Sequence, residues 1–135
     1  MDIHKIIYDT TRQLMTVEEK LRISTIFLFC HSSGTLEFSE LLYTDSPEKY
    51  INNLNDSYKY WHIDLKIDFS NKNVKNSFEL TRKAIIEKHD KDGYYKAVYK
   101  KDPFALVIAE IANTSFDIQS FSKKVTAINE QLKLF

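Results

Sequence analysis

The spacing of apolar residues changes halfway along the segment from residue 36 to residue 81. In residues 46–61 the apolar side chains recur at steps of three and four, at Ile51, Leu54, Tyr58 and Trp61. This is the pattern of a helix with one buried face. Pro47 suits the first helical position, and we expect the hydroxyl of Ser46 to accept free N–H groups of the first turn. The pattern therefore predicts a helix over residues 46–61.

The period falls to two directly after this helix. Apolar side chains alternate with polar ones over residues 62–69, as in a half-buried strand, with Ile63, Leu65, Ile67 and Phe69 on one side. Residues 70–73 are polar and read as a turn. Val74, Phe78 and Leu80 then alternate with polar residues, which favours a returning strand. The sequence predicts a two-stranded β-hairpin after the helix.

Two helices are expected before this segment, over residues 2–15 and 16–31. Thr16 and Glu19 form a capping-box pattern at the start of the second. Residues 23–30 are apolar on almost every side and should lie in the core. A short apolar run also fits a buried strand, in which case residues 31–34 would be a hairpin turn. The capping box favours the helix.

The order of these elements predicts a winged helix-turn-helix. A short helix over residues 39–43 precedes the helix at 46–61, and another helix is expected over residues 82–89. Residues 94–101 receive no assignment. The predicted fold class is mainly α (α+β), with a two-stranded β-wing and terminal dimerisation helices. The predicted division is an N-terminal helix (1–15), a winged-helix domain (16–91) and a C-terminal helical extension (92–135).

The C-terminal extension has the most regular spacing in the chain. Asp102 and Pro103 suit a helix start, and apolar residues then recur at steps of three and four from residue 118 onward. An amphipathic helix that packs on its own domain gives the same pattern. The small size of the domain favours a homodimer, with an interface formed by Ile118, Phe121, Val125, Ile128 and Leu132.

Composition narrows the class of protein further. The chain has 135 residues, and nineteen basic residues balance nineteen acidic ones, so net charge does not favour a nucleic-acid partner. The single cysteine, Cys30, excludes an internal disulfide and suits a reducing compartment. No apolar run approaches the roughly twenty residues that cross a membrane, and residues 1–4 do not open a signal peptide. We expect a cytoplasmic protein with no membrane contact.

The segments 38–41, 51–54 and 80–81 carry a family resemblance. Phe38-Ser39-Glu40-Leu41, the leucine-spaced helix face and the closing Leu80-Thr81 resemble the winged-helix regulators of the MarR and ArsR style. The resemblance implies a homodimer that binds double-stranded DNA and regulates transcription. It departs from the family pattern at residues 60–62, Tyr-Trp-His, where a glycine often stands. The recognition helix also carries Glu48 and Asp56 against Lys49 and Lys59, so its net charge is zero.

The predicted DNA-binding residues are polar or basic side chains on the outer face of the helix and on the wing. Asparagine pairs with adenine in the major groove, and lysine reaches guanine or phosphate. These residues are Ser46, Lys49, Asn52, Asn53, Lys59, Lys66, Lys72, Asn73 and Lys75. The alternative is a small protein-interaction module without DNA binding, such as an immunity protein, an antitoxin or a phage-type inhibitor. The balanced charge of the helix favours this alternative, whereas the basic wing tip and the predicted dimer helix favour DNA binding. The sequence therefore predicts a dimeric DNA-binding transcriptional regulator.

Catalytic chemistry has little support in the sequence. Cys30 and His31 are the only adjacent pair of soft metal ligands, and no second cluster at metal spacing accompanies them. With two glycines in the chain, a phosphate-binding glycine loop is excluded. We therefore expect no enzyme, no metal and no cofactor. Tyr58, Tyr60 and Trp61 form an aromatic cluster that fits a core joint better than a ligand pocket.

Overall fold

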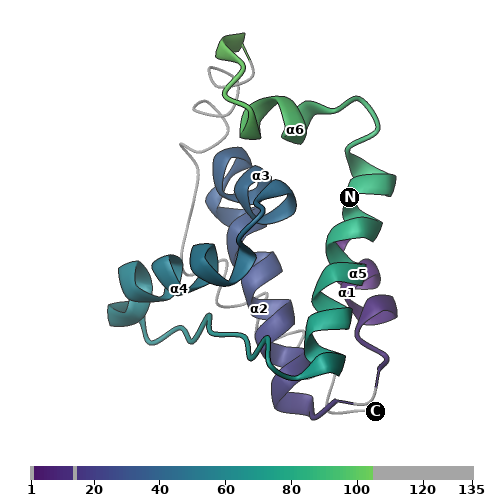
Figure 1. The fold of residues 1–135 in the computed structure, drawn as a ribbon, viewed down its shortest axis with the longest axis vertical. Coiled ribbons are helices and arrows are strands. Elements are labelled where there is room, and N and C mark those ends of the chain that lie inside the picture. The colour runs from purple at the N-terminus through teal and green to yellow at the C-terminus, as the bar shows by residue number, and fades with distance from the viewer. Residues whose placement is uncertain (1, 14, 105–135) are drawn as a thin grey trace.

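The computed structural model describes residues 2–13 and 15–104, and these residues form helices joined by short connections (Figure 1). In chain order the elements are α1 (Ile3–Thr10), α2 (Val17–Ser33), α3 (Thr35–Tyr43), α4 (Pro47–Tyr58), the 3-10 helix η1 (Lys59–Trp61), α5 (Lys72–His89) and α6 (Tyr94–Tyr99). No β-strand occurs in these two ranges. For these residues the mainly α part of the predicted fold class is confirmed, and the predicted two-stranded sheet is wrong.

Helix α2 lies at the centre of the core. Its N-terminus has the predicted capping box, because the Thr16 hydroxyl accepts the N–H of Glu19 at 3.1 Å and the Glu19 carboxylate accepts the N–H of Thr16 at 2.8 Å. All residues from 23 to 30 are buried. The helix is therefore confirmed here and the strand alternative is wrong. Figure 1 shows α3 at one end of α2 and α1 beside α5, while α4 projects from the body.

The segment of residues 62–69 keeps the predicted alternation but has no partner strand within residues 2–13 and 15–104. Leu65 and Ile67 are buried, while the alternating positions Asp64, Lys66 and Asp68 are exposed. Side chains satisfy part of its backbone in place of a β-ladder. The Leu65 N–H donates to Asn55 Oδ1 at 3.1 Å, and the Lys66 carbonyl accepts from Arg22 Nη1 at 3.5 Å. The first half of the predicted wing is an extended segment bound to two helices.

The second half of the predicted wing is the N-terminal part of α5. A strand would place Leu80 inside and Ser77 outside, but Leu80 is 47% exposed and Ser77 is 0% exposed. The buried face follows helical spacing, at Val74, Ser77, Phe78, Thr81 and Ile85. The β-wing is thus wrong, and with it the winged helix-turn-helix fold. Two core positions of α5 are hydroxyl residues, which hides the helical period from an analysis of apolar residues alone.

The hydroxyl residues of this face connect α5 to α1. Ser77 Oγ donates to the Thr10 carbonyl at 2.8 Å, and the hydroxyls of Thr10 and Thr81 lie 2.6 Å apart. Thr81 Oγ1 also lies 2.8 Å from the Ser77 carbonyl and donates to it. Because their polar atoms are bonded, these small side chains can occupy the core between two helices without the penalty of an unpaired hydroxyl.

The other predicted elements differ mainly in their bounds. Helix α1 ends at Thr10, α3 begins four residues earlier than expected, and α6 occupies the segment that received no assignment. The predicted dimer interface at residues 118–132 lies outside the described residues. No helix in the described part of the chain has the length and apolar character that a membrane crossing requires.

Candidate functional site: a groove between α4 and α5

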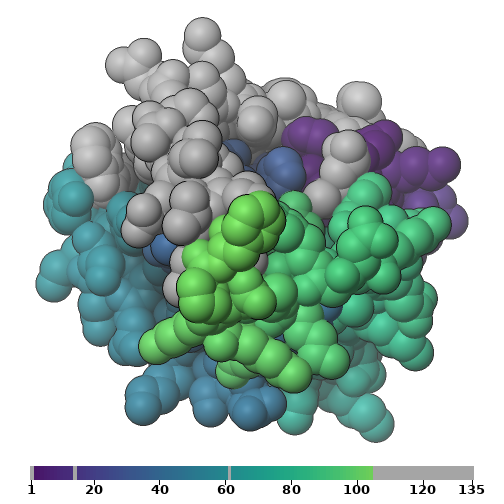
Figure 2. Space-filling view, turned by 90° about the horizontal axis from the view of Figure 1, so that it is seen from above, coloured from purple at the N-terminus to yellow at the C-terminus, as the bar shows by residue number. Residues whose placement is uncertain are grey.

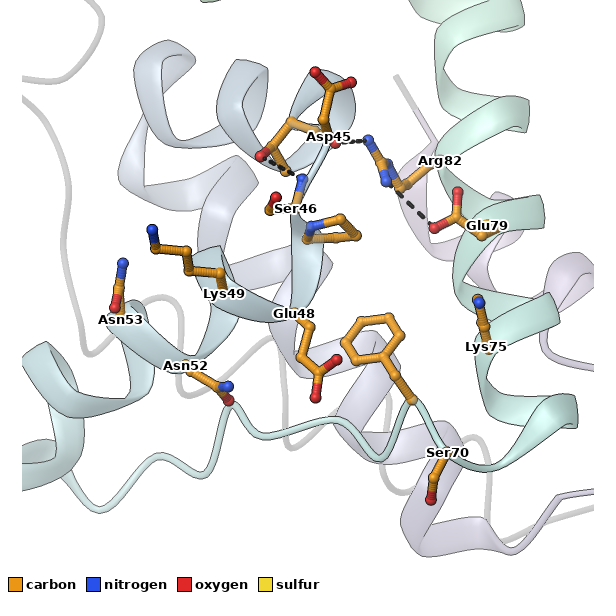
Figure 3. A pocket seen from close by; sticks show the side chains of 13 residues that line it. Asp45, Ser46, Glu48, Lys49, Asn52, Asn53, Ser70, Lys75, Glu79 and Arg82 are labelled. Atoms are coloured by element: carbon orange, nitrogen blue, oxygen red, sulfur yellow. Dashed lines mark hydrogen bonds and ion pairs between the residues drawn. The ribbon is translucent and has the colours of Figure 1, made fainter.

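A groove of about 1150 Å³ lies between the first half of α4 and the first half of α5 (Figure 3). We call it the α4–α5 groove. One wall is the turn before α4 and the outer face of α4, and the other is a face of α5. Phe69 and Ser70 belong to the chain that joins the two walls. The lining residues are Thr44, Asp45, Ser46, Pro47, Glu48, Lys49, Asn52, Asn53, Phe69, Ser70, Lys75, Glu79 and Arg82.

Arg82 fixes the end of the groove where α3 turns into α4. Its guanidinium donates to the Leu42 carbonyl at 2.9 Å and 3.2 Å and to the Thr44 carbonyl at 2.8 Å. It also forms an ion pair of 3.3 Å with Glu79 on its own helix (Figure 3). The last carbonyl groups of a helix lack partners within the helix, and a cation there is favourable. Arg82 therefore ties the α3–α4 turn to α5.

The chain that joins the walls is held from both sides. Asn55 of α4 binds the N–H of Leu65, as described above. Arg22 of α2 forms an ion pair of 3.1 Å with Asp64 and another of 2.9 Å with Glu18. The ring of Phe69 meets the Phe78 ring edge-on at a centroid distance of 5.1 Å. This half-buried ring gives the groove an apolar part next to α5.

The charges of the groove are balanced. Its lining has three basic side chains, Lys49, Lys75 and Arg82, and three acidic ones, Asp45, Glu48 and Glu79. Arg82 and Glu79 neutralise each other in their ion pair. Lys49, Lys75, Asp45 and Glu48 are exposed, so both signs of charge face solvent at the groove. A site of this kind does not attract the uniform negative charge of a phosphate backbone.

The structure divides the predicted DNA-binding residues into two sets. Five of them line the groove, namely Ser46, Lys49, Asn52, Asn53 and Lys75. The other four do not line it. Lys59 is in η1, Lys66 is in the extended segment, and Lys72 and Asn73 form the first turn of α5 instead of a wing. Ser46 occupies the expected N-cap position of α4, but its side chain makes no capping hydrogen bond.

Sequence reasoning missed Arg82, which determines the shape of the groove. Its partners Leu42 and Thr44 lie about forty residues earlier in the chain. The sequence predicted a helix only from Arg82 onward. The side of the helix on which Arg82 lies follows only when the helix is known to begin at Lys72. A strand assignment over residues 74–80 conceals it.

A second polar cluster lies behind α4, on the side of α2 and α3. The Tyr50 hydroxyl is 2.7 Å from Glu37 Oε2 and 3.0 Å from the Glu37 carbonyl, and it lies 4.0 Å from Cys30 Sγ. Burial raises the pKa of the Tyr50 phenol and also raises the pKa of the Cys30 thiol. Both groups therefore stay protonated at neutral pH. The cluster fastens α4 to its neighbours, and Cys30 has none of the thiolate character of a nucleophile.

The remaining candidates from the sequence are a metal site near Cys30 and His31 and the aromatic cluster at Tyr58 and Tyr60. Within residues 2–13 and 15–104, no group of three or more histidine, cysteine, aspartate or glutamate residues is arranged to hold a metal ion. His31 packs edge-on against Phe38. Tyr58 packs edge-on against Phe29 of α2 at a centroid distance of 4.6 Å, so this ring joins α4 to the core and not to the predicted wing, whereas Tyr60 is 67% exposed.

Comparison of the chain with models of protein families, with curated proteins and with solved structures gave no match. The resemblance to the winged-helix regulators therefore stays a prediction from the sequence, and the β-wing on which it partly rested is wrong. The α4–α5 groove has to be interpreted from its own residues.

Proposed function

We propose that this chain is a small protein-interaction module that binds a segment of a partner protein in the α4–α5 groove. One observation carries the proposal, namely a groove of about 1150 Å³ whose exposed charges are balanced. Pockets for small molecules usually have volumes of about 300–1000 Å³, so the groove has room for a longer ligand such as a peptide segment.

The side chains of the groove suit a polypeptide. Asn52 and Asn53 each offer an amide that donates and accepts hydrogen bonds, as a peptide backbone requires. Pro47 and Phe69 provide apolar surface, and Glu48 and Lys75 offer charges of opposite sign on opposite walls (Figure 3). A protein interface commonly combines such an apolar part with a polar rim.

The proposal is tested by photo-crosslinking from inside the groove. A photoreactive amino acid replaces Asn52 in one variant and the exposed Lys5 of α1 in a control variant. We expect a discrete partner to crosslink from position 52 and not from position 5. The identified partner, purified, should then lose affinity when Lys75 is changed to Glu, and it should bind the Lys5→Glu variant normally. Equal crosslinking from both positions contradicts the proposal.

DNA recognition by α4 is the second candidate. Lys49, Asn52 and Asn53 are exposed on the outer face of this helix, where a DNA-reading helix presents its side chains. On this hypothesis Asn52→Ala or Asn53→Ala costs about 1–3 kcal/mol of binding free energy and relaxes preference at one base pair. A transcriptional regulator would act as a homodimer through residues 118–132, which light scattering on a Val125→Asp, Ile128→Asp variant tests.

The proposed location is the cytoplasm. The buried, protonated Cys30 suits a reducing compartment, because no disulfide or reactive thiol is required of it. An interaction module that binds a cytoplasmic partner, without catalysis of its own, agrees with this chemistry.

A further inference from the structure

A second pocket, of about 340 Å³, lies where α3, α4 and α6 meet, and we call it the α3–α6 pocket. Helix α3 gives it three side chains, α4 gives one, and the others come from the end of α6 and from the residue just beyond it. The lining residues are Leu36, Glu37, Glu40, Tyr50, Val98, Tyr99 and Lys101. None of them lines the α4–α5 groove, so the two sites are separate.

Aromatic contacts hold α6 against α3 and so shape the pocket. Tyr95 meets Phe38 edge-on at a centroid distance of 5.1 Å, and the rings of Tyr99 and Tyr43 stack at 6.2 Å. The carboxylate of the buried Asp90 accepts the N–H of Tyr95 at 2.9 Å, which fixes the start of α6. Figure 2 looks onto this end of the molecule, where the green atoms of α6 and of the residues up to 104 lie beside the blue atoms of α3. Because both helices are fixed, their side chains keep a defined arrangement around the pocket.

One part of the pocket is acidic. Glu37 and Glu40 are three residues apart in α3, so they lie on the same side of that helix, and both are partly buried. The Tyr50 hydroxyl donates to Glu37 Oε2 at 2.7 Å and holds this carboxylate in place. Glu40 forms no ion pair with another described residue. Since charges partly removed from water attract each other more strongly than exposed ones, this part of the pocket favours a positively charged group such as an ammonium.

Lys101 brings the opposite charge to the same pocket. It forms no ion pair with either glutamate or with any other described residue, although all three side chains line the pocket. The two signs of charge are thus held apart. A ligand that carries both an ammonium and a carboxylate can match both ends, whereas a ligand of one sign leaves one end without a partner.

The backbone places Lys101 at a position that usually belongs to glycine. Its φ of 63° lies in the left-handed region. Its N–H donates to the Val98 carbonyl at 2.9 Å, and the N–H of Asp102 donates to the Ala97 carbonyl at 2.9 Å, which is the pattern of a helix that ends in a left-handed residue. The turn alone favours glycine there. The place of the lysine side chain in the pocket gives a reason for the strained residue.

The remaining lining and the volume limit the kind of ligand. Leu36 is exposed beside the pocket, Val98 is buried, and Tyr99 adds part of its ring, so the ligand needs an apolar group. A volume of about 340 Å³ is at the lower end of the range of about 300–1000 Å³ for small-molecule sites. Two carboxylates against one lysine disfavour a phosphate ligand. Within the described residues, no acidic, histidine or cysteine group is arranged to hold a metal ion.

We propose that the α3–α6 pocket binds a small zwitterion with an apolar group, namely an apolar α-amino acid. Its ammonium lies at Glu37 and Glu40, its carboxylate lies at Lys101, and its side chain packs against Leu36 and Val98. This arrangement uses each group that lines the pocket. It is independent of a partner protein in the groove.

The first measurement is calorimetric titration of the full chain with L-leucine and, separately, with L-phenylalanine up to millimolar concentrations. We expect saturable binding of at least one of them at one site per chain. N-acetylation of that amino acid removes its ammonium, and conversion to the amide removes its carboxylate. Each change leaves a charged group of the pocket without its partner and should weaken binding about tenfold or more.

Matched variants assign the two ends of the ligand. Glu40→Gln should weaken binding of the amino acid much more than binding of its N-acetyl form, and Lys101→Gln should weaken it much more than binding of its amide. The control is Glu48→Gln with Lys75→Gln in the groove, which removes one charge of each sign and should bind the amino acid as the wild type does.

Lys101→Gly separates binding from folding. Glycine relieves the left-handed backbone, so this variant should melt at a higher temperature than the wild type and still bind the amino acid more weakly. A general loss of structure would instead lower the melting temperature.

Three results overturn the proposal. These are no saturable binding of either amino acid, an affinity for the N-acetyl form or the amide equal to that for the amino acid itself, and a loss of binding in the groove control equal to that of Lys101→Gln. None of them affects the crosslinking test from position 52. The failure of this proposal and the failure of the groove proposal are therefore distinguishable.

Discussion

The two walls of the groove are helices that the protein holds in different ways. Helix α5 buries a continuous face of five residues and begins with a side-chain cap, in which Asn71 Oδ1 accepts the N–H groups of Asn73 and Val74. Helix α4 buries only Ile51 and Leu54, and its N-cap residue makes no capping hydrogen bond. One wall is thus part of the core along most of its length, while the other has a shorter buried face and is also held by polar contacts.

This difference explains how the groove can serve as a binding site. The polar contacts of α4 come from Asn55, from Tyr50, and from Arg82 acting on the turn before the helix. Segments with few buried apolar contacts open at a lower free energy than core helices. We therefore expect α5 to act as the fixed wall and α4 to adjust when a partner segment binds.

The largest predicted effect concerns the core face of α5. Phe78 is fully buried and its ring contacts both Phe27 and Phe69, so Phe78→Ala should cost about 3–5 kcal/mol of unfolding free energy. Leu80→Ala, at an exposed position, should change it by less than about 0.5 kcal/mol. Urea denaturation measures both. A β-hairpin with Leu80 in its core predicts a large cost for Leu80→Ala as well.

The next effect concerns the tie between the two walls. Arg82→Ala leaves the carbonyls of Leu42 and Thr44 without their donor and should cost about 1–3 kcal/mol. It should also speed hydrogen exchange in α4 more than in α5. The neighbouring Lys83→Ala variant removes an exposed charge and serves as the control. If exchange rises equally in both helices, Arg82 contributes general stability and does not position α4.

The two walls also differ in how well the sequence predicts them. Helix α4 is visible in the sequence because its buried positions are apolar and Pro47 marks its start. In α5, Ser77 and Thr81 occupy core positions, so an analysis of apolar residues finds Val74, Phe78 and Leu80 and assigns the wrong period. These hydroxyl groups can lie in the core because they form hydrogen bonds with Thr10 of α1. Thr10 is about seventy positions away in the chain, so local spacing does not reveal the contact.

The groove itself could be predicted only in part. The exposed positions of Lys49, Asn52 and Asn53 follow from the period of α4, and Lys75 was expected near them. The opposite wall required the correct helix for residues 72–89. The alternation over residues 62–69 is also correct as a pattern of burial. It did not reveal that side chains of Asn55 and Arg22, in place of a second strand, would bind the backbone.

A smaller effect is expected at the N-cap residues of the two helices, Asn71 and Ser46. Asn71→Ala removes the cap of α5 and should cost about 1 kcal/mol. Ser46→Ala, at the same position of α4, should cost only a few tenths, about 0.3 kcal/mol or less, because no side-chain cap exists to be lost. Thermal melting of the two variants tests this. Equal costs would show that Ser46 also caps its helix in solution.

The last effect appears only at alkaline pH and concerns Tyr50, whose phenol attaches α4 to α3. Burial raises its pKa above the ordinary value, so the folded state keeps the proton that the unfolded chain loses above about pH 10. This contribution to stability is fully present below pH about 10 and is lost as the pH rises further. Stability curves at alkaline pH should fall less steeply for Tyr50→Phe than for the wild type, and equal slopes would contradict the role of this phenol.

Native-state hydrogen exchange tests the difference between the walls most directly. The amides in the middle of α5, around Phe78 and Thr81, should exchange only through opening near the global free energy of unfolding. Those of the outer half of α4, after Leu54, should exchange through a smaller opening. Equal protection of the two helices would contradict a fixed and an adjustable wall. Protection that alternates between neighbouring residues from 74 to 80 would contradict the α5 helix itself.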